Sequence, residues 1–144
     1  MKLSAHFTLD EMTRTNTGLK NHVYRTEHYI NLSRLVCLVL EPLRLDCGAL
    51  NVTSGYRSPE VNKKVHGSPE SRHVLGLAAD IQSATYTPME LAEAVQRLGL
   101  PIDKIICEFN SWLHIQVAPA GHTNRDEYLI ASKINGKVNY ERMT

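Results

Sequence analysis

Residues 71–80 read SRHVLGLAAD, and this stretch decides how the chain folds. It places His73 and Asp80 seven residues apart, around one glycine and two alanines. A surface loop needs no alanines at these positions, and a buried strand has little use for either polar side chain. A metal ion accounts for both, because imidazole nitrogen and carboxylate oxygen are donors that zinc accepts. The alternative is a histidine–aspartate hydrogen bond that stabilises a loop.

A straight strand cannot bring these two side chains together. Side chains seven positions apart on one strand point to opposite faces of a sheet, so the segment must bend between them. Gly76 permits the bend, and Ala78 and Ala79 let the backbone pack closely beside an ion. Residues 77–83, LAADIQS, then predict a short strand that carries Asp80.

A third metal ligand is expected from a neighbouring strand. Zinc in a catalytic site takes three protein ligands and keeps a fourth position for water. Residues 112–117, WLHIQV, alternate so that Trp112, His114 and Gln116 share one face. The opposite face is purely apolar and belongs in the core: Leu113, Ile115 and Val117. His114 therefore faces a site or solvent, and we expect it to be the third ligand.

Glu108 is the predicted general base. Residues 104–109, KIICEF, predict a strand joined to the next by a tight turn at Asn110 and Ser111. The two strands can pair so that the residue numbers of directly opposite residues add up to an even number. In that register Glu108 and His114 share a face, roughly 7 to 8 Å apart at the backbone. The other register buries an unpaired carboxylate in the core, which is costly, so we expect the even one. The alternative is an ordinary carboxylate at a strand end.

Arg57 is the predicted substrate binder. It lies in residues 55–59, GYRSP, just before a helix that Ser58 caps and Pro59 begins. A guanidinium beside a zinc site can hold a substrate carboxylate through two parallel hydrogen bonds. Pairing with a nearby acid is the alternative. Asn62 is expected to cap the segment after Arg57 or to hold it in place.

The remaining elements predict an α+β domain of helices around a small antiparallel sheet. Thr8 and Glu11 form a capping box, and residues 26–41 predict a long core helix that Pro42 kinks or ends, with Gly48 as a later stop. Its expected core side chains are Ile30, Leu35, Val36, Leu38, Val39 and Leu43. Residues 49–55 predict a strand, residues 87–99 a capped helix, and Asn135–Gly136 a hairpin turn.

Composition excludes several classes of protein. The chain of 144 residues fits one domain, 1–144, and its formal net charge of +1 predicts neither nucleic acid nor a membrane surface as a partner. The longest apolar run, LVCLVL, is far too short to span a bilayer, and the first residues lack a signal-peptide pattern. We expect a monomer made in a cytosol, with its three cysteines as buried thiols.

The motifs together resemble a known family. Residues 54–81, SGYRSPEVNKKVHGSPESRHVLGLAADI, and 108–117, EFNSWLHIQV, resemble the zinc D-alanyl-D-alanine peptidases. That family contains D,D-carboxypeptidases, D,D-dipeptidases and phage endolysins that cut between L-Ala and D-Glu. Residues 5–12 and 31–44 resemble its small phage-like branch. The resemblance extends to about residue 117 and implies a fold of the hedgehog and D-Ala-D-Ala peptidase type.

The resemblance implies a role for each motif residue. His73, Asp80 and His114 become the ligands of one zinc ion, and Glu108 becomes the base. Substrate contacts are implied at three positions: Arg57, Ser71 and Trp112, the last as a wall of the cleft. Two departures stand out. Some branches have a glutamate where this chain has Ser111, and residues 66–67 read His-Gly where Gly-Gly is commoner.

The implied activity is hydrolysis of an amide bond in a peptidoglycan stem peptide. The bond is either the terminal D-Ala-D-Ala bond or the L-Ala-D-Glu bond. The alternative is a catalytically inactive zinc-containing module that binds peptidoglycan or forms part of a phage particle. A glutamate that points away from the metal, or a closed shell of four protein ligands, would favour this alternative. We expect the protein to be made in the bacterial host cytoplasm and to act on the cell wall after release. Residues 118–144 predict a hairpin segment without chemistry.

Overall fold

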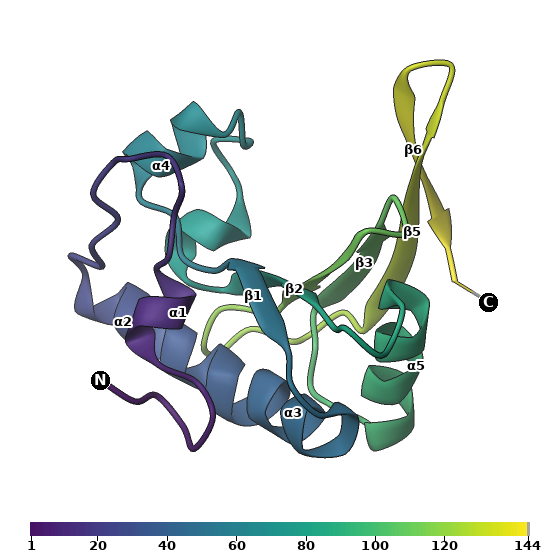
Figure 1. The fold of residues 1–144 in the computed structure, drawn as a ribbon, viewed down its shortest axis with the longest axis horizontal. Helices are drawn as coiled ribbons and strands as arrows, with labels where there is room; N and C mark the ends of the chain where they lie inside the picture. Colours follow the sequence, from purple (N-terminus) through teal and green to yellow (C-terminus); the bar gives the residue numbers. More distant parts are fainter. Residues whose placement is uncertain (144) are drawn as a thin grey trace.

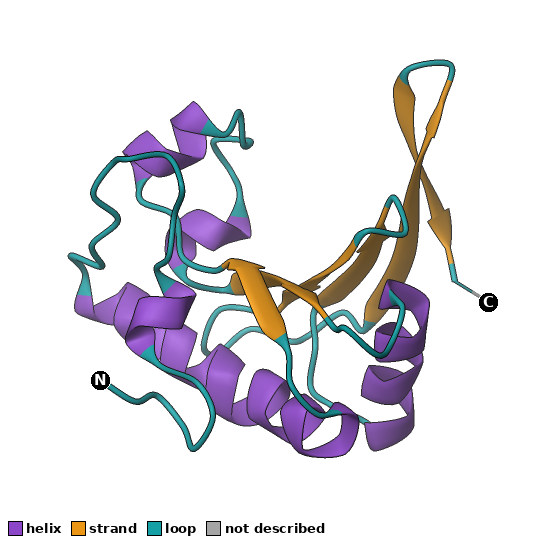
Figure 2. Ribbon diagram, in the orientation of Figure 1, coloured by secondary structure: helices purple, strands orange, loops and turns teal. Residues whose placement is uncertain are grey.

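Six strands form one sheet, and the longer helices cover one of its faces (Figures 1 and 2). The computed structural model describes residues 1–143. The spatial order of the strands is β1 (Asn51–Ser54), β2 (Ala78–Gln82), β4 (Trp112–Gln116), β3 (Lys104–Glu108), β5 (Glu127–Ile134) and β6 (Lys137–Arg142). All neighbours are antiparallel except β3 and β5. The predicted α+β class is confirmed, and the one parallel pair departs from a purely antiparallel sheet.

The short helices begin where their capping residues predict. Helix α1 (Leu9–Met12) has the capping box of Thr8 and Glu11. Ser58 caps α4 (Pro59–Lys64) by accepting a hydrogen bond from Val61 N. Thr87 and Glu90 form a second capping box on α5 (Pro88–Leu98), and Gly99 ends that helix in a left-handed conformation. Each cap satisfies backbone N–H groups that the first turn leaves without a partner.

The long helix continues past Pro42 instead of ending there. It consists of α2 (Thr26–Leu35), a π-helical turn η1 (Val36–Leu40) and α3 (Glu41–Cys47). Proline lacks an N–H and its ring clashes with the carbonyl four residues earlier. In the π turn Glu41 N donates to Val36 O, five residues back, and the widened turn makes room for the ring. Gly48 ends the helix as predicted.

The core lies between this helix, α5 and the covered face of the sheet. Four of the six predicted core side chains of the helix are buried, whereas Ile30 and Leu38 are exposed. The expectation of buried thiols is also wrong for Cys37, which is exposed, and Cys47 is only half-buried. Cys107 is buried on β3, where burial raises the pKa of its thiol to about 11. Cys37 and Leu38 both lie in the π turn, which changes the helical positions that face the sheet.

The hairpin of β3 and β4 has the predicted even register. Glu108 lies opposite Trp112, and Ile106 lies opposite His114. The turn is centred on Phe109 and Asn110, both with φ of 54°, one residue earlier than predicted. The Phe109 backbone N donates to Ala131 O of β5, which holds this residue in its left-handed conformation.

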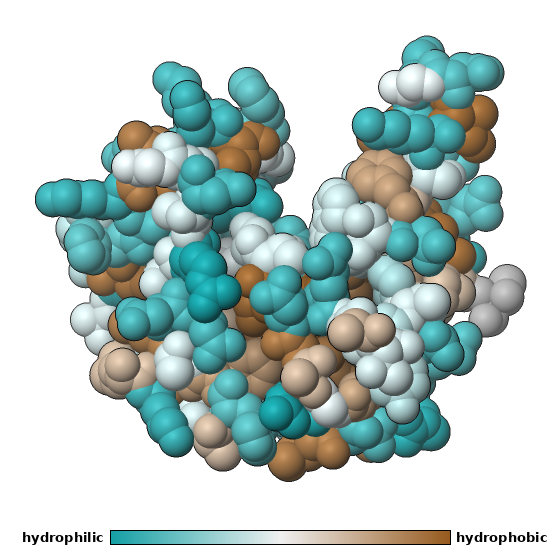
Figure 3. Space-filling model, in the orientation of Figure 1, coloured by the Kyte–Doolittle hydropathy of each residue, from teal (hydrophilic) through white to brown (hydrophobic). Residues whose placement is uncertain are grey.

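The uncovered face of the sheet is hollowed. Figure 3 shows a hollow between the lobe that contains α4 and the projecting hairpin of β5 and β6. Asn135 and Gly136 form the turn of that hairpin, as predicted, and both have positive φ. No helix within residues 1–143 is long and apolar enough to cross a membrane.

Candidate metal centre

His73, Asp80 and His114 come together on the uncovered side of the sheet. Their ligand atoms all lie within 4.8 Å of one another. Oδ1 of Asp80 is 3.4 Å from Nε2 of His73 and 3.1 Å from Nδ1 of His114. Within the described part of the chain, no other group of three such residues forms a cluster of this kind.

The bend predicted between His73 and Asp80 is a helical turn that ends in a glycine. His73 lies in the 3-10 helix η2 (Arg72–Leu75), which Ser71 caps by accepting a hydrogen bond from His73 N. Gly76 then has a φ of +74°, and a Cβ there would lie 2.5 Å from the His28 carbonyl oxygen. The chain therefore turns sharply and passes directly into β2, which carries Asp80.

The sheet register places Asp80 beside His114. The two residues lie directly opposite each other on the antiparallel strands β2 and β4. Opposite side chains project from the same face, so the carboxylate and the imidazole meet without any distortion of the strands. Ala78 and Ala79 are fully buried next to Asp80, as expected for close backbone packing at this point.

The donors fit a zinc ion. Zinc–ligand bonds of roughly 2.0–2.1 Å in a tetrahedron place neighbouring ligand atoms about 3.3 Å apart. The two measured separations from Asp80 Oδ1 bracket this value. Nδ1 of His73 donates to the Gly55 carbonyl at 2.8 Å, so Nε2 is the nitrogen that faces the cluster. Nε2 of His114 contacts Oε1 of Gln116 at 3.0 Å, and its Nδ1 faces the cluster.

The electrostatics of the cluster keep Asp80 ionised. Burial alone would raise the pKa of Asp80, but hydrogen bonds from His114 and His73 outweigh it and hold the pKa well below its ordinary value. Burial lowers the pKa of His73 despite the nearby carboxylate. Hydrogen bonds with Asp80 and Gln116 raise the pKa of His114 despite its burial. Metal binding needs a carboxylate and neutral imidazole nitrogens, so an ion at this cluster competes with protons for His114.

Glu108 lies on the same face as the cluster. It is half-buried at the end of β3, opposite Trp112 and two positions along from the partner of His114. Burial raises the pKa of Glu108, while the charges of His114 and Asp80 act on it in opposite directions. A half-buried carboxyl beside the donors is placed to exchange a proton with a group held at the cluster.

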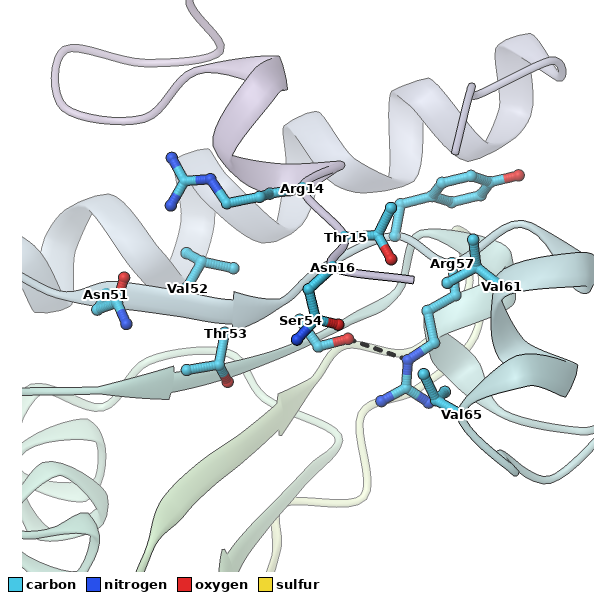
Figure 4. Close-up of a pocket in the computed structure, with 11 residues that line it drawn as sticks. Arg14, Thr15, Asn16, Asn51, Val52, Thr53, Ser54, Arg57, Val61 and Val65 are labelled. Carbon is cyan, nitrogen blue, oxygen red and sulfur yellow. Dashed lines mark hydrogen bonds between the residues drawn. The ribbon is translucent and has the colours of Figure 1, made fainter. Parts of the chain in front are cut away.

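Arg57 also reaches the cluster. Its Nη2 lies 3.6 Å from Oδ2 of Asp80. Its Nε donates to Oγ of Ser54 at 3.0 Å, and Figure 4 shows this hydrogen bond. Asn62 accepts from Nη1 at 3.3 Å and donates to the Ser68 carbonyl, so it pins both the arginine and the following loop. Arg57 lines a cavity of about 440 Å³ beside the free edge of β1 (Figure 4).

The His66-Gly67 pair has a structural explanation. His66 has a φ of 60°, a left-handed conformation that glycine adopts without cost, which accounts for the glycine that is commoner there. At Gly67 a Cβ would collide with Oδ1 of Asn62 and would lie 3.0 Å from Nη1 of Arg57. The absence of a side chain at residue 67 therefore keeps Arg57 in place.

Two other predicted residues border the cluster. Ser71 lines a second cavity, of about 710 Å³, together with His114 and Gln116. Trp112 is half-buried and packs edge-on against Phe109, with ring centroids 5.8 Å apart. Sequence reasoning missed the contact partners of the histidines, Gly55 and Gln116. Only Gln116 left a signal, because it lies two residues after His114 on the same strand face.

A comparison with known families adds to this geometry. A family model described as Peptidase M15 matches residues 5–116. The chain belongs to the peptidase M15 family. The match confirms the predicted family membership. The members of this family are zinc metallopeptidases that act on peptidoglycan-type substrates. A search of curated proteins found no match. The peptidase M15 match includes every residue of the cluster and ends at Gln116, close to the predicted limit of the resemblance.

Proposed function

We propose that this protein is a zinc-dependent peptidase that hydrolyses an amide bond in peptidoglycan stem peptides. His73, Asp80 and His114 would hold the ion. The observation that carries the proposal is a cluster of three donors whose ligand atoms lie within 4.8 Å of one another, with Glu108 on the same face of the sheet. With three protein donors, a fourth position is left for water or substrate, which is the pattern of catalytic zinc sites.

The protein's own residues supply proton transfer and substrate binding. A zinc ion held at this cluster polarises the scissile carbonyl and lowers the pKa of a water molecule towards roughly 7. Glu108 accepts a proton from the attacking water and returns it to the leaving amine. Burial raises the pKa of Glu108, which moves it towards the working pH and favours a carboxyl group that both accepts and returns a proton.

Arg57 is proposed to hold a substrate carboxylate or carbonyl oxygen. Its hydrogen bonds use Nε and one N–H of Nη1. N–H groups on both terminal nitrogens therefore remain for a bidentate grip on a carboxylate. Contacts with Ser54, Asn62 and Asp80 hold the guanidinium in one orientation, so little side-chain entropy is lost when the substrate binds.

The scissile bond is either terminal or internal. Arg57 suits the free carboxylate of a D-Ala-D-Ala end, which favours a carboxypeptidase. The cavities lined by Arg57 and by His114 give a longer peptide room to cross the metal, which suits an L-Ala-D-Glu endopeptidase. The resemblance to the small phage-like branch supports the endopeptidase, acting on the wall after release from the host cytoplasm. An inactive zinc module is the alternative, and the position of Glu108 argues against it.

Mass spectrometry of purified muropeptides, incubated with the zinc-loaded protein, tests the proposal. Loss of one terminal alanine would identify a carboxypeptidase, and release of the stem after L-Ala an endopeptidase. Glu108→Gln should lower the rate about 10²- to 10⁴-fold and bind zinc as wild type does. The control Glu93→Gln changes an exposed glutamate on α5 and should keep full activity. If every muropeptide stays intact with the wild-type protein, the inactive module becomes the better account.

A further inference from the structure

We propose that Asp103 and Arg125 are positioning residues, which act through Gln116 to fix the orientation of the metal ligand His114. The inference rests on the proposed function, since it concerns the same metal centre. It adds residues to which neither the sequence motifs nor the family match assigns a role. Arg125 lies outside the matched residues, in the segment for which the sequence predicted no chemistry.

The four side chains form one continuous chain of hydrogen bonds. Nε2 of His114 lies 3.0 Å from Oε1 of Gln116, and Nε2 of Gln116 donates to Oδ2 of Asp103 at 3.0 Å. Arg125 donates to both oxygens of Asp103, from Nε at 3.1 Å and from Nη2 at 2.8 Å. Gln116 and Asp103 are both buried, so water competes little for the contact between them, whereas the Arg125 side chain is half exposed.

The chemistry of the groups sets the direction of every bond. Arg125 has only donors, and the ionised Asp103 has only acceptors. The amide of Gln116 must therefore turn its NH₂ towards Asp103 and its oxygen towards His114. An oxygen can only accept, so Nε2 of His114 must carry the proton. Nδ1, the nitrogen that faces Asp80, is then the one that would supply a lone pair to a bound ion.

Asp103 is in turn fixed by the backbone of β4, of β5 and of the segment just before β5. Its N–H donates to the Gln116 carbonyl at the end of β4, and its carbonyl accepts from Glu127 N at the start of β5. The backbone N of Arg125 also donates to Oδ1 of Asp103, at 2.9 Å. The carboxylate cannot turn without breaking contacts to several segments. This rigidity is what a metal ligand needs from its outer partners.

Zinc affinity of the purified protein, measured by competition with a chromophoric chelator, tests the proposal. Gln116→Met keeps the length of the side chain but provides no acceptor for His114, and should weaken zinc binding about 10- to 100-fold. Arg125→Ala should weaken it severalfold, although Arg125 does not touch the cluster. The visible spectrum of the cobalt-substituted protein should shift in both variants, because the geometry at the metal changes.

Two further variants separate positioning from general stability. Arg97→Ala removes a similar arginine–aspartate pair, with Asp46 at 2.7 Å, and should leave zinc affinity and the cobalt spectrum unchanged. Arg125→Lys keeps a cationic donor beside Asp103 and should lose less zinc affinity than Arg125→Ala.

The outcomes distinguish this inference from the proposed function. If wild type binds zinc while Gln116→Met and Arg125→Ala match its affinity and cobalt spectrum, the positioning role is overturned and the metal centre stands. If wild type binds no zinc, the proposed function falls and this inference falls with it.

Discussion

Single residues of this peptidase M15 protein are constrained by their neighbours as much as by their own chemistry. Arg57 could face the cluster in many rotamers, but Ser54, Asn62 and Asp80 select one. Gly67 matters only for the side chain it lacks, because a Cβ there would collide with Asn62. A motif glycine can therefore support a substrate contact without touching the substrate.

Gly67→Ala is the prediction at this scale. The added methyl group should displace the Asn62 amide and the Arg57 guanidinium, and kcat/KM on a carboxylate-bearing peptide should fall about 10-fold through a higher KM. Zinc affinity should not change, because neither displaced group is a ligand. Asn62→Ala should produce a similar defect, since it removes the same support. Full activity of Gly67→Ala would show that Arg57 does not depend on this contact.

At the scale of elements, the site depends on how one segment ends and the next begins. The η2 turn ends at Gly76, and β2 starts two residues later, so His73 and Asp80 lie in the same cluster despite their spacing. The β3–β4 turn has the same kind of effect, because its left-handed Phe109 and Asn110 set the register that puts Glu108 on the face of His114.

Gly76→Ala tests the first of these junctions. The substitution strains a left-handed residue and brings a Cβ to 2.5 Å from the His28 carbonyl oxygen. The free energy of unfolding should fall by about 2 to 4 kcal/mol, measured by urea denaturation of the metal-free protein. Gly121→Ala is the matched control: its φ is +82° and nothing lies within 4 Å, so only about 1 kcal/mol should be lost. Equal losses would mean that the His28 contact relaxes freely.

For the whole molecule, Asp103 joins parts of the chain that are far apart in sequence. Its backbone and carboxylate contact the end of β4, the start of β5 and Arg125 before it. These contacts lie where β5 begins to run parallel to β3. Hydrogen bonds from Arg125 hold the pKa of Asp103 well below its ordinary value despite burial.

The stability of the metal-free protein should therefore depend on the charge of Asp103. A lowered carboxyl pKa stabilises the fold above the pKa of the unfolded chain, near 3.9, and this stabilisation is lost as the pH falls below it. Asp103→Asn should cost about 1 to 3 kcal/mol at pH 7, and the difference from wild type should shrink between about pH 4 and pH 2. Urea unfolding at several pH values measures it. A difference that stays constant down to pH 2 would contradict this role.

Much of the fold and of the site follows from local patterns in the sequence. Capping residues predicted where α1, α4 and α5 begin, and alternation predicted which face of β4 enters the core. These signals are local, because a cap satisfies backbone groups within one turn and strand faces alternate with a period of two. The three residues of the cluster were also predicted from the sequence, because zinc accepts few kinds of side chain: His73, Asp80 and His114.

The tertiary structure alone decided which distant residues meet. Strand order put β3 beside β5 in parallel, the π turn carried the helix past Pro42, and packing brought Arg125 and Asp103 behind Gln116. None of these has a local signature, because each contact forms between residues far apart in sequence or depends on packing summed over the whole chain. The sequence by itself predicted the three residues of the cluster and the strand faces they occupy. The assembled sheet determined which distant side chains form hydrogen bonds with them.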